Sequence, residues 1–117
     1  MKIYISGQIT GLPYEEAEKA FNESETRLKK FGFEVVNPLK KEIPNTASWT
    51  EHMRMDIKLL MDCDTIYMLR NFRQSNGAMI EYELAKKLGY TVIRQMSPST
   101  DTVDDIRDTE PFSTGIE

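Results

Sequence analysis

Apolar residues along the first 95 positions follow two different periods. Short runs rich in β-branched and aromatic residues are typical of buried strands, and helical segments repeat their apolar residues every three or four positions. Four runs have the strand character: residues 2–6 (KIYIS), 33–38 (FEVVNP), 64–69 (DTIYML) and 91–95 (TVIRQ). The second run must end at Asn37-Pro38, because proline has no N–H to donate to a ladder.

Three helices are predicted between these strands. The first begins near Pro13, where a missing N–H costs nothing, continues to about Lys30 and stops at Gly32. The second starts at residues 48–51 (SWTE), which have the spacing of a capping box. The third covers residues 76–88, with Ser75 or Asn76 as its cap. The apolar stripes predict Trp49, Met53, Ile57, Leu60 and Met61 as the packing face of the second helix, and Ile80, Leu84 and Leu88 as that of the third.

Alternation of strands and helices predicts an α/β fold, a small parallel sheet of four or five strands with helices on both faces. A chain of 117 residues with 39% hydrophobic composition is long enough for one core and too short for two. Residues 1–95 are therefore predicted to form the domain. Residues 96–117 lack a periodic pattern, so we expect an extended or disordered acidic tail.

Charge and composition exclude several classes of function. Residues 101–117 hold six acids against Arg107, so the net charge of −4 leaves the preceding hundred residues at +1, without a basic stripe for a nucleic-acid polymer. No stretch has the roughly 18 apolar residues of a membrane span, and no signal-peptide pattern is present, so we expect a soluble, cytoplasmic protein. The sequence has one cysteine, Cys63, which excludes a thiolate zinc cluster. It has one histidine, His52, which disfavours a Ser-His triad.

Parallel sheets bind ligands beyond the carboxyl ends of their strands. Three features converge there: the loop from Gly7 to Gly11, the turn at Asn37-Pro38, and the start of the third helix at residues 75–77. The glycine loop taken alone is better explained as a tight strand-to-helix turn, since it is not GxGxxG. The outward N–H groups of the helix start could bind an anion or a sugar hydroxyl.

Two carboxylates stand out near this edge. Glu81 flanks the predicted packing line of the third helix, whereas Glu83 lies about 200° away and should face solvent. Asp56 lies at the margin of the second helix's apolar face, where an unpaired carboxylate costs several kcal/mol. Structural alternatives stay open: Glu81 could be a first-turn acid favoured by the helix dipole, and Asp56 a buried cap or the partner of a local Arg or Lys.

Other polar and aromatic positions have structural explanations that are at least as good. Asp64 opens the third strand and could be a plain turn residue. His52 is expected to be an exposed polar residue rather than a catalyst. Four large side chains are expected in the core rather than stacked on a base: Tyr4, Trp49, Tyr67 and Met68.

Taken together, these segments resemble the nucleoside 2-deoxyribosyltransferase superfamily, especially its small, often phage-encoded members of unknown function. The resemblance covers about residues 1–95 and rests on MKIYISGQITG, VVNP, HMRMDIKLLMDCDTIYML and SNGAMIEYELAKKLGYTVI. Its most specific element is the spacing of Asp56, Asp64, Ser75, Gly77 and Glu81. Residues 96–117 lie outside it.

The resemblance implies a flavodoxin-like three-layer sandwich that breaks the N-glycosidic bond of 2′-deoxynucleosides or their 5′-monophosphates without a metal or cofactor. Glu81 would attack the anomeric carbon and hold the sugar as an ester, and Asp56 would act on the departing base as proton donor or hydrogen-bond partner. The segments expected to line the sugar and base pocket comprise Tyr4, Gly7, Gln8, Ile9, Gly11, Asn37, Asp64, Ser75, Asn76 and Gly77.

Two carboxyl groups suffice for such chemistry, as in retaining glycosidases, if Glu81 is ionised and Asp56 at least partly protonated when the substrate is bound. Serine at position 75, where deoxyribosyltransferases tend to have aspartate, favours a 5′-monophosphate, with Arg70 and Arg73 as candidates to neutralise it. The resemblance also implies a homodimer or larger homo-oligomer. Transfer and hydrolysis both stay open, as do a non-catalytic nucleotide binder and an interaction scaffold that uses the acidic tail.

Overall fold

The computed structural model describes residues 1–44 and 46–95. The prediction of an extended or disordered tail at residues 96–117 lies outside them. The elements alternate along the chain: β1 (Lys2–Ser6), α1 (Tyr14–Lys30), β2 (Glu34–Val36), η1 (Pro38–Lys40), α2 (Trp49–Met61), β3 (Thr65–Met68), η2 (Phe72–Gln74), α3 (Asn76–Lys87) and β4 (Thr91–Arg94). All predicted strands and helices are present, and η1 and η2 are additional short 3₁₀ turns.

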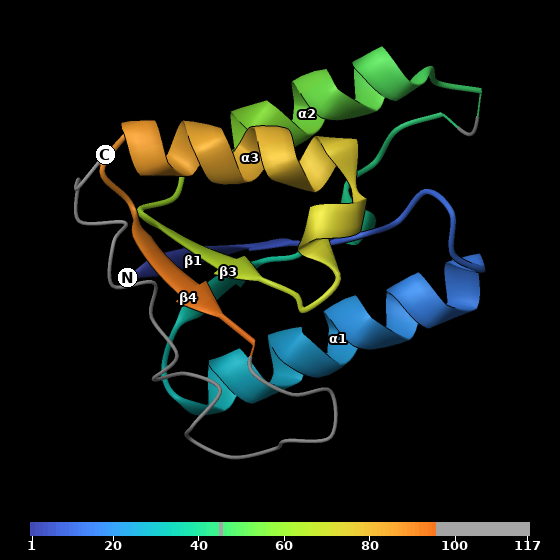
Figure 1. Cartoon of the computed structure of the whole chain (residues 1–117). Coiled ribbons are helices and arrows are strands. Elements are labelled where there is room, and N and C mark those ends of the chain that lie inside the picture. Colours follow the sequence, from blue (N-terminus) through green and yellow to red (C-terminus); the bar gives the residue numbers. More distant parts are fainter. Residues whose placement is uncertain (45, 96–117) are drawn as a thin grey trace.

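The described strands form one parallel sheet in the order β2-β1-β3-β4. Helix α1 covers one face of this sheet, and α2 and α3 lie together on the other (Figure 1). The predicted three-layer α/β sandwich is therefore confirmed. Because β1 lies between β2 and β3, the chain moves outward from β1 in both directions, and the crevice expected at such a reversal opens at the carboxyl end of β1.

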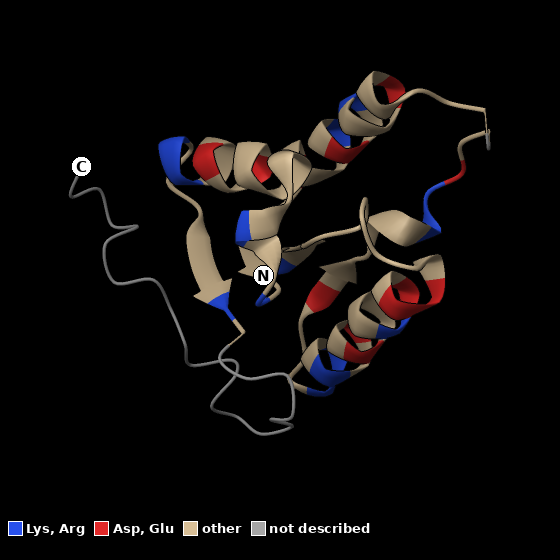
Figure 2. Ribbon diagram, turned by 45° about the vertical axis from the view of Figure 1, so that its right-hand side comes forward, with Lys and Arg blue, Asp and Glu red and all other residues tan. Residues whose placement is uncertain are grey.

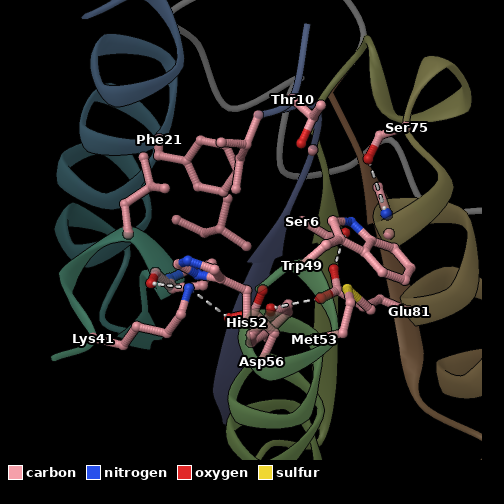
Figure 3. Close-up of a pocket in the computed structure, with 18 of the residues that line it drawn as sticks. Ser6, Thr10, Phe21, Lys41, Trp49, His52, Met53, Asp56, Ser75 and Glu81 are labelled. Carbon is pink, nitrogen blue, oxygen red and sulfur yellow. Dashed lines mark hydrogen bonds and ion pairs between the residues drawn. The ribbon is translucent and has the colours of Figure 1, made fainter. Parts of the chain in front are cut away.

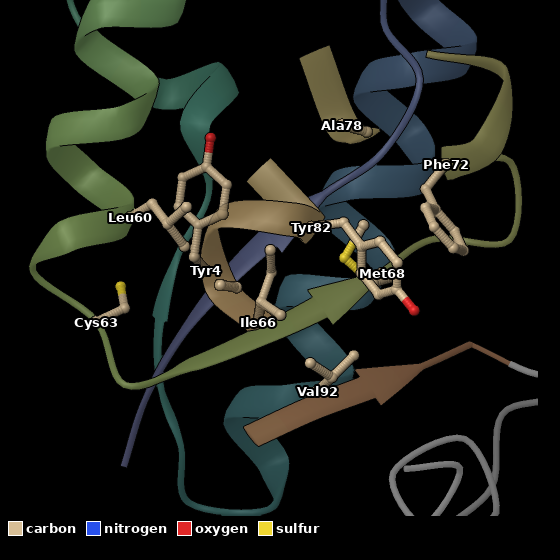
Figure 4. Packing of buried hydrophobic residues seen from close by; sticks show 10 residues of the cluster. Tyr4, Leu60, Cys63, Ile66, Met68, Phe72, Ala78, Tyr82 and Val92 are labelled. Carbon is tan, nitrogen blue, oxygen red and sulfur yellow. The ribbon is translucent and has the colours of Figure 1, made fainter. Parts of the chain in front are cut away.

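Alternation along the strands divides the core into two clusters, one on each face of the sheet. Ile3 and Ile5 pack with Phe21 and Leu28 of α1. The intervening residue, Tyr4, faces α2 and α3 and lies with Leu60, Ile66, Met68, Tyr82 and Val92 (Figure 4). Tyr67 and Met68 are buried, as predicted. Ser6 continues the Tyr4 side of the strand, which directs its hydroxyl toward α3.

Helix α3 does not bury the face that its apolar stripe predicts. Ile80 and Leu88 are 44% and 42% exposed, so the predicted packing line is wrong at both ends. The helix instead buries Ala78, Glu81, Tyr82 and Ala85. The alanines allow close approach to the sheet, Tyr82 packs on Phe72 with ring centroids 5.0 Å apart, and Glu81 bonds to β1. Small residues and one paired carboxylate therefore decide the orientation of α3.

The capping box at the start of α2 is confirmed, since the Ser48 hydroxyl accepts from the Glu51 N–H and the Glu51 carboxylate accepts from the Ser48 N–H. Met53 and Leu60 of the predicted stripe are buried, but Trp49 and Met61 are half exposed, so the core placement of Trp49 is wrong. Helix α1 begins after Pro13 and carries acidic and basic residues on its outer side (Figure 2). Gly32, at φ +90°, follows its end as predicted.

Candidate active site

A pocket of about 490 Å³ lies at the carboxyl end of β1. Its walls come from the β1–α1 loop, the segment after β2, and the first turns of α2 and α3. The segments that follow β2 and β3, the two strands beside β1, therefore enclose the point where the strand order reverses. Figure 3 shows Glu81 and Asp56, from different helices, facing this one hollow.

Glu81 is 5% exposed and is held by two hydroxyls of β1. Tyr4 Oη donates to Oε2 at 2.8 Å, and Ser6 Oγ donates to Oε1 at 2.7 Å. Burial raises the pKa of Glu81 to about 7; the bond from Ser6 opposes this rise, and the charge of Asp56 adds to it. The carboxyl group of Glu81 is thus fixed in position and changes its charge close to neutral pH.

Local structure accounts for this arrangement. Tyr4 and Ser6 are two residues apart on β1, so both side chains point to the same face of the sheet. Ser75 caps α3, its hydroxyl accepting from the Ala78 N–H at 3.1 Å, and Gly77 lets the helix start close to α2. A Cβ at Gly77 would lie 3.0 Å from the Met53 sulfur. Glu81 then follows six residues after the cap, on the second turn of the helix.

Asp56 is 6% exposed and its Oδ1 lies 2.9 Å from Nζ of Lys41, which follows η1. Burial raises the pKa of Asp56, and the hydrogen bond and charge of Lys41 oppose that rise. Asp56 is therefore paired with a lysine, as one alternative expected, but this lysine comes from the segment after η1 and is not local in the sequence. Pairing and a place in the pocket are compatible, since both residues line it.

The two carboxyl groups differ in their partners. Burial raises the pKa of Glu81 to about 7, and its hydrogen-bond donors among the described residues are the neutral hydroxyls of Tyr4 and Ser6. Asp56 forms a salt bridge with the Lys41 ammonium group, which opposes the rise of the Asp56 pKa. The expectation that Glu81 is ionised and Asp56 partly protonated concerns the ligand-bound protein and stays a prediction.

Most, but not all, predicted site residues line the pocket. Those that do are Tyr4, Gly7, Ile9, Asp56, Ser75, Gly77 and Glu81; those that do not are Gln8, Gly11, Asn37, Asp64 and Asn76. Asn37 instead donates to Asn22 and Glu25, in a network that fastens η1 to α1. Asp64 stands at the opposite, amino end of β3, where it accepts from the Lys2 N–H and from Thr65, which lowers its pKa.

The arginines expected to neutralise a phosphate are elsewhere. Arg70 and Arg73 line a separate hollow with Arg94 beyond the carboxyl ends of β3 and β4. Arg73 lies over the ring of Phe72, 4.7 Å from its centroid. The candidate role of Arg70 and Arg73 in the main pocket is therefore wrong.

Sequence patterns did not identify many residues of the pocket wall, among them Ser6, whose hydroxyl donates to Glu81. Lys41 lies in an irregular segment without a periodic signal, and His52, expected to be only an exposed polar residue, lines the pocket. Trp49 and Tyr14, each about half exposed, also border it. His52 and Trp49 lie four and seven residues before Asp56 on one helix, so helical spacing was a signal that could have found them.

Within residues 1–44 and 46–95, no group of three or more His, Cys, Asp or Glu side chains is arranged to hold a metal ion. Across the same residues no helix has both the length and the apolar composition to cross a bilayer.

The chain belongs to the family described as domain of unknown function DUF4406, whose model matches residues 1–94. No curated protein matches the sequence. Among solved structures, the fold is similar to a 2-deoxyribosyltransferase from Bacillus psychrosaccharolyticus, with a TM-score of 0.64 and 21% identity over 80% of this chain and 71% of that one. It is also similar to the CMP N-glycosidase BcmB of Clostridium botulinum, with a TM-score of 0.56 and 19% identity over 80% of this chain and 67% of that one. The chain thus has the nucleoside 2-deoxyribosyltransferase-like fold that its sequence predicts.

Proposed function

We propose that the protein cleaves or transfers the N-glycosidic bond of 2′-deoxynucleosides or their 5′-monophosphates through a glycosyl ester of Glu81. The observation that carries this proposal is the buried Glu81 carboxyl group, fixed by Tyr4 and Ser6 on the wall of a pocket large enough for a small ligand. The fold it shares with a 2-deoxyribosyltransferase and a CMP N-glycosidase supports the same chemistry.

Glu81 has the environment that a nucleophilic carboxylate needs. Two hydroxyl donors fix its orientation, and burial keeps competing water away from the sugar ester. In the reaction, an ionised Glu81 oxygen bonds to C1′ as the bond from C1′ to the base breaks, and the electron pair of that bond leaves with the base. Water or a second base then displaces Glu81, which regenerates the carboxylate.

Asp56 lines the same pocket from α2, where it would contact the base rather than the sugar. Its salt bridge with Lys41 favours a role as hydrogen-bond acceptor for the base. Trp49, which is 50% exposed, supplies aromatic surface in the same pocket, on which a planar base can stack. The pocket therefore offers a carboxylate for the sugar and a polar and aromatic wall for the base.

The sugar 5′ position would lie toward the first turn of α3. Ser75 and Gly77 line the pocket there, and the N–H groups of a helix start favour a phosphate. A 5′-monophosphate is accordingly the preferred substrate class. Arg70 and Arg73 do not take part, so this preference rests on the helix start and Ser75.

A panel of deoxynucleosides and their 5′-monophosphates tests the proposal, with free base followed by chromatography. Wild-type protein should release base from at least one member, and Glu81→Ala should lose release by at least about a thousandfold while ligand still raises its melting temperature. Glu83→Ala is the matched control, because Glu83 is exposed on the same helix and should retain activity. Tight binding without base release by wild-type protein would instead establish a nucleotide binder.

A further inference from the structure

Lys41 is a buried cation whose position the proposed mechanism has not used. Its side chain is 6% exposed, and Nζ lies 2.9 Å from Oδ1 of Asp56 and 3.3 Å from the carbonyl oxygen of Pro38. A lysine ammonium carries three protons. Within the described residues these two contacts occupy two of them, and the residue lines the pocket, so the third is available to a ligand.

Lys41 contrasts with its neighbour in the chain. The Lys40 side chain is 61% exposed and pairs with the buried Glu25 of α1, and neither residue lines the pocket. Burying an ammonium group is expensive unless good partners surround it, and fastening η1 does not require it, because Asn37 already bonds to Asn22 and Glu25. A buried cation that lines a pocket is therefore better explained by something that enters the pocket.

We propose that Lys41, rather than Asp56, donates the hydrogen bond that stabilises the departing nucleobase; this inference rests on the proposed function. A carboxylate that accepts a salt bridge has no proton to give, whereas the ammonium it holds has one directed at the ligand. Asp56 is then a positioning residue that fixes the Lys41 ammonium group. Lys41 and Asp56 line the same pocket as Glu81, and Figure 3 shows the Lys41 side chain reaching toward Asp56.

The step balances without any further reactant. As the Glu81 oxygen bonds to C1′, the bond from C1′ to the ring nitrogen breaks and its electron pair enters the base. The base departs as an anion whose nitrogen or carbonyl oxygen accepts a hydrogen bond from Lys41, and it then takes a proton from water. Lys41 keeps its own proton, and stabilising charge that develops in the transition state accelerates the step.

Leaving-group dependence separates this role from a structural one. A 7-methylguanine base departs neutral, so it needs no donor, whereas guanine departs as an anion. The test compares Lys41→Met and wild-type protein on 2′-deoxyguanosine 5′-monophosphate and its 7-methyl derivative. If the wild-type protein acts only on pyrimidines, 2′-deoxyuridine and 5-fluoro-2′-deoxyuridine 5′-monophosphates replace them, since 5-fluorouracil is the better leaving group.

Lys41→Met should lower kcat/KM about a hundredfold on the ordinary base and much less, about fivefold or below, on the good leaving group. Lys40→Met is the matched control and should change neither by more than about twofold. Equal losses on both substrates would overturn the proposal and leave Lys41 a structural residue. A leaving-group-dependent loss in Asp56→Asn instead of Lys41→Met would return the donor role to Asp56.

Two outcomes remain to be separated. If Lys41→Met does not fold, the Lys41→Met/Asp56→Asn double variant removes both charges, leaves none unpaired, and should show the same difference between substrates. If wild-type protein releases no base from any substrate of either kind, the proposed function fails and the role of Lys41 fails with it. Base release by wild-type protein with equal losses in the variant refutes only the role of Lys41.

Discussion

Two buried glutamates of this protein have almost the same exposure and opposite properties. Glu25 of α1 is 6% exposed and Glu81 of α3 is 5% exposed. Burial alone would raise the pKa of Glu25, but hydrogen bonds from Lys29, Lys40 and Asn37 outweigh it and lower the pKa to about 2. Among residues 1–44 and 46–95, Glu81 receives side-chain hydrogen bonds from two hydroxyls, and burial raises its pKa to about 7.

The difference lies in the partners and not in the depth of burial. Lys29 and Lys40 each lie 2.8 Å from Glu25, so this carboxylate is neutralised and joins α1 to η1. Glu81 accepts hydrogen bonds from neutral donors and faces a pocket, so its negative charge, when it is ionised, can interact with a ligand. A buried carboxyl group next to cations is typical of a structural ion pair. A buried carboxyl group held by hydroxyls at a pocket wall is typical of a catalytic residue.

The largest expected effect is an opposite change in stability when each glutamate is replaced by glutamine. Glu81 has a folded pKa of about 7, above its ordinary value of 4.5, so its contribution to stability is complete below pH 4.5 and is lost as pH rises to 7. Glu81→Gln does not titrate and should exceed wild-type stability at pH 8 by up to about 3 kcal/mol. The two should be nearly equal at pH 4.5.

Glu25→Gln should behave in the opposite sense. Its folded pKa of about 2 lies below 4.5, so its contribution is present above pH 4.5 and is lost as pH falls to 2. Because both lysine partners are largely exposed, the loss at pH 7 should be only about 1 kcal/mol. Urea unfolding across this pH range measures both variants. A change of stability in the same direction for both substitutions at pH 8 would contradict the claim that the two glutamates have opposite effects on stability.

Activity should follow the ionisation of Glu81. A nucleophilic carboxylate is active when ionised, so kcat/KM should rise with pH through about 7 and level off above it. Below pH 7 the fall should approach tenfold per pH unit, which makes kcat/KM at pH 5 about a hundredfold lower than at pH 8. Base release at low substrate concentration measures this profile. A profile that is flat from pH 5 to 8 would show that Glu81 does not limit the reaction in this way.

Removing one hydroxyl donor should sharpen the contrast. Tyr4 Oη bonds to Oε2 of Glu81 and favours the ionised form, so Tyr4→Phe should raise the pKa of Glu81 further. A hydrogen bond to a charged group corresponds to about one pKa unit, so the midpoint of the kcat/KM profile should move upward by about 1. An unchanged or lowered midpoint would mean that Tyr4 does not favour the ionised form of Glu81.

The smallest effect is expected at the other glutamate. Lys40→Met removes one cation from Glu25 but leaves Lys29 and Asn37 in place, so stability at pH 7 should fall by about 0.5 kcal/mol or less. The pKa of Glu25 should rise while activity is unchanged, which NMR titration of the side-chain carboxyl group can follow. A loss of activity above about twofold would connect Glu25 to the pocket and weaken the comparison.

The regular parts of the fold could be predicted from the sequence because short strands, the capping box and Gly32 are local signals. The positions of Glu81 and Asp56 along their predicted helices also indicated correctly that both lie at one edge of the sheet. The prediction that Asp64 lines the pocket was wrong for a reason visible in the sequence. Asp64 stands before β3, and the start of a parallel strand lies at the edge of the sheet opposite the site. Its position next to the strand was a sufficient signal.

Tertiary packing decided what the sequence could not reveal. The stripe of Ile80, Leu84 and Leu88 ranks as the buried face by hydrophobicity, yet contacts with β1 and Phe72 turn α3 so that Ala78 and Glu81 face inward. Lys41 lies in a segment without periodicity, so only the folded chain brings it to Asp56. The charge state of Asp56 depends in part on that pair and therefore could not be predicted either.

The most direct measurement is the mass of the intact protein quenched during turnover, with a 2′-deoxy-2′-fluoroarabinosyl substrate used to slow release of the sugar. We expect the wild-type mass to increase by one sugar group, or one sugar phosphate for a 5′-monophosphate, on the peptide that contains Glu81. Glu81→Gln should show no increase. Base release by wild-type protein without any adduct, or with an adduct on another residue, would contradict the assignment of Glu81 as the nucleophile.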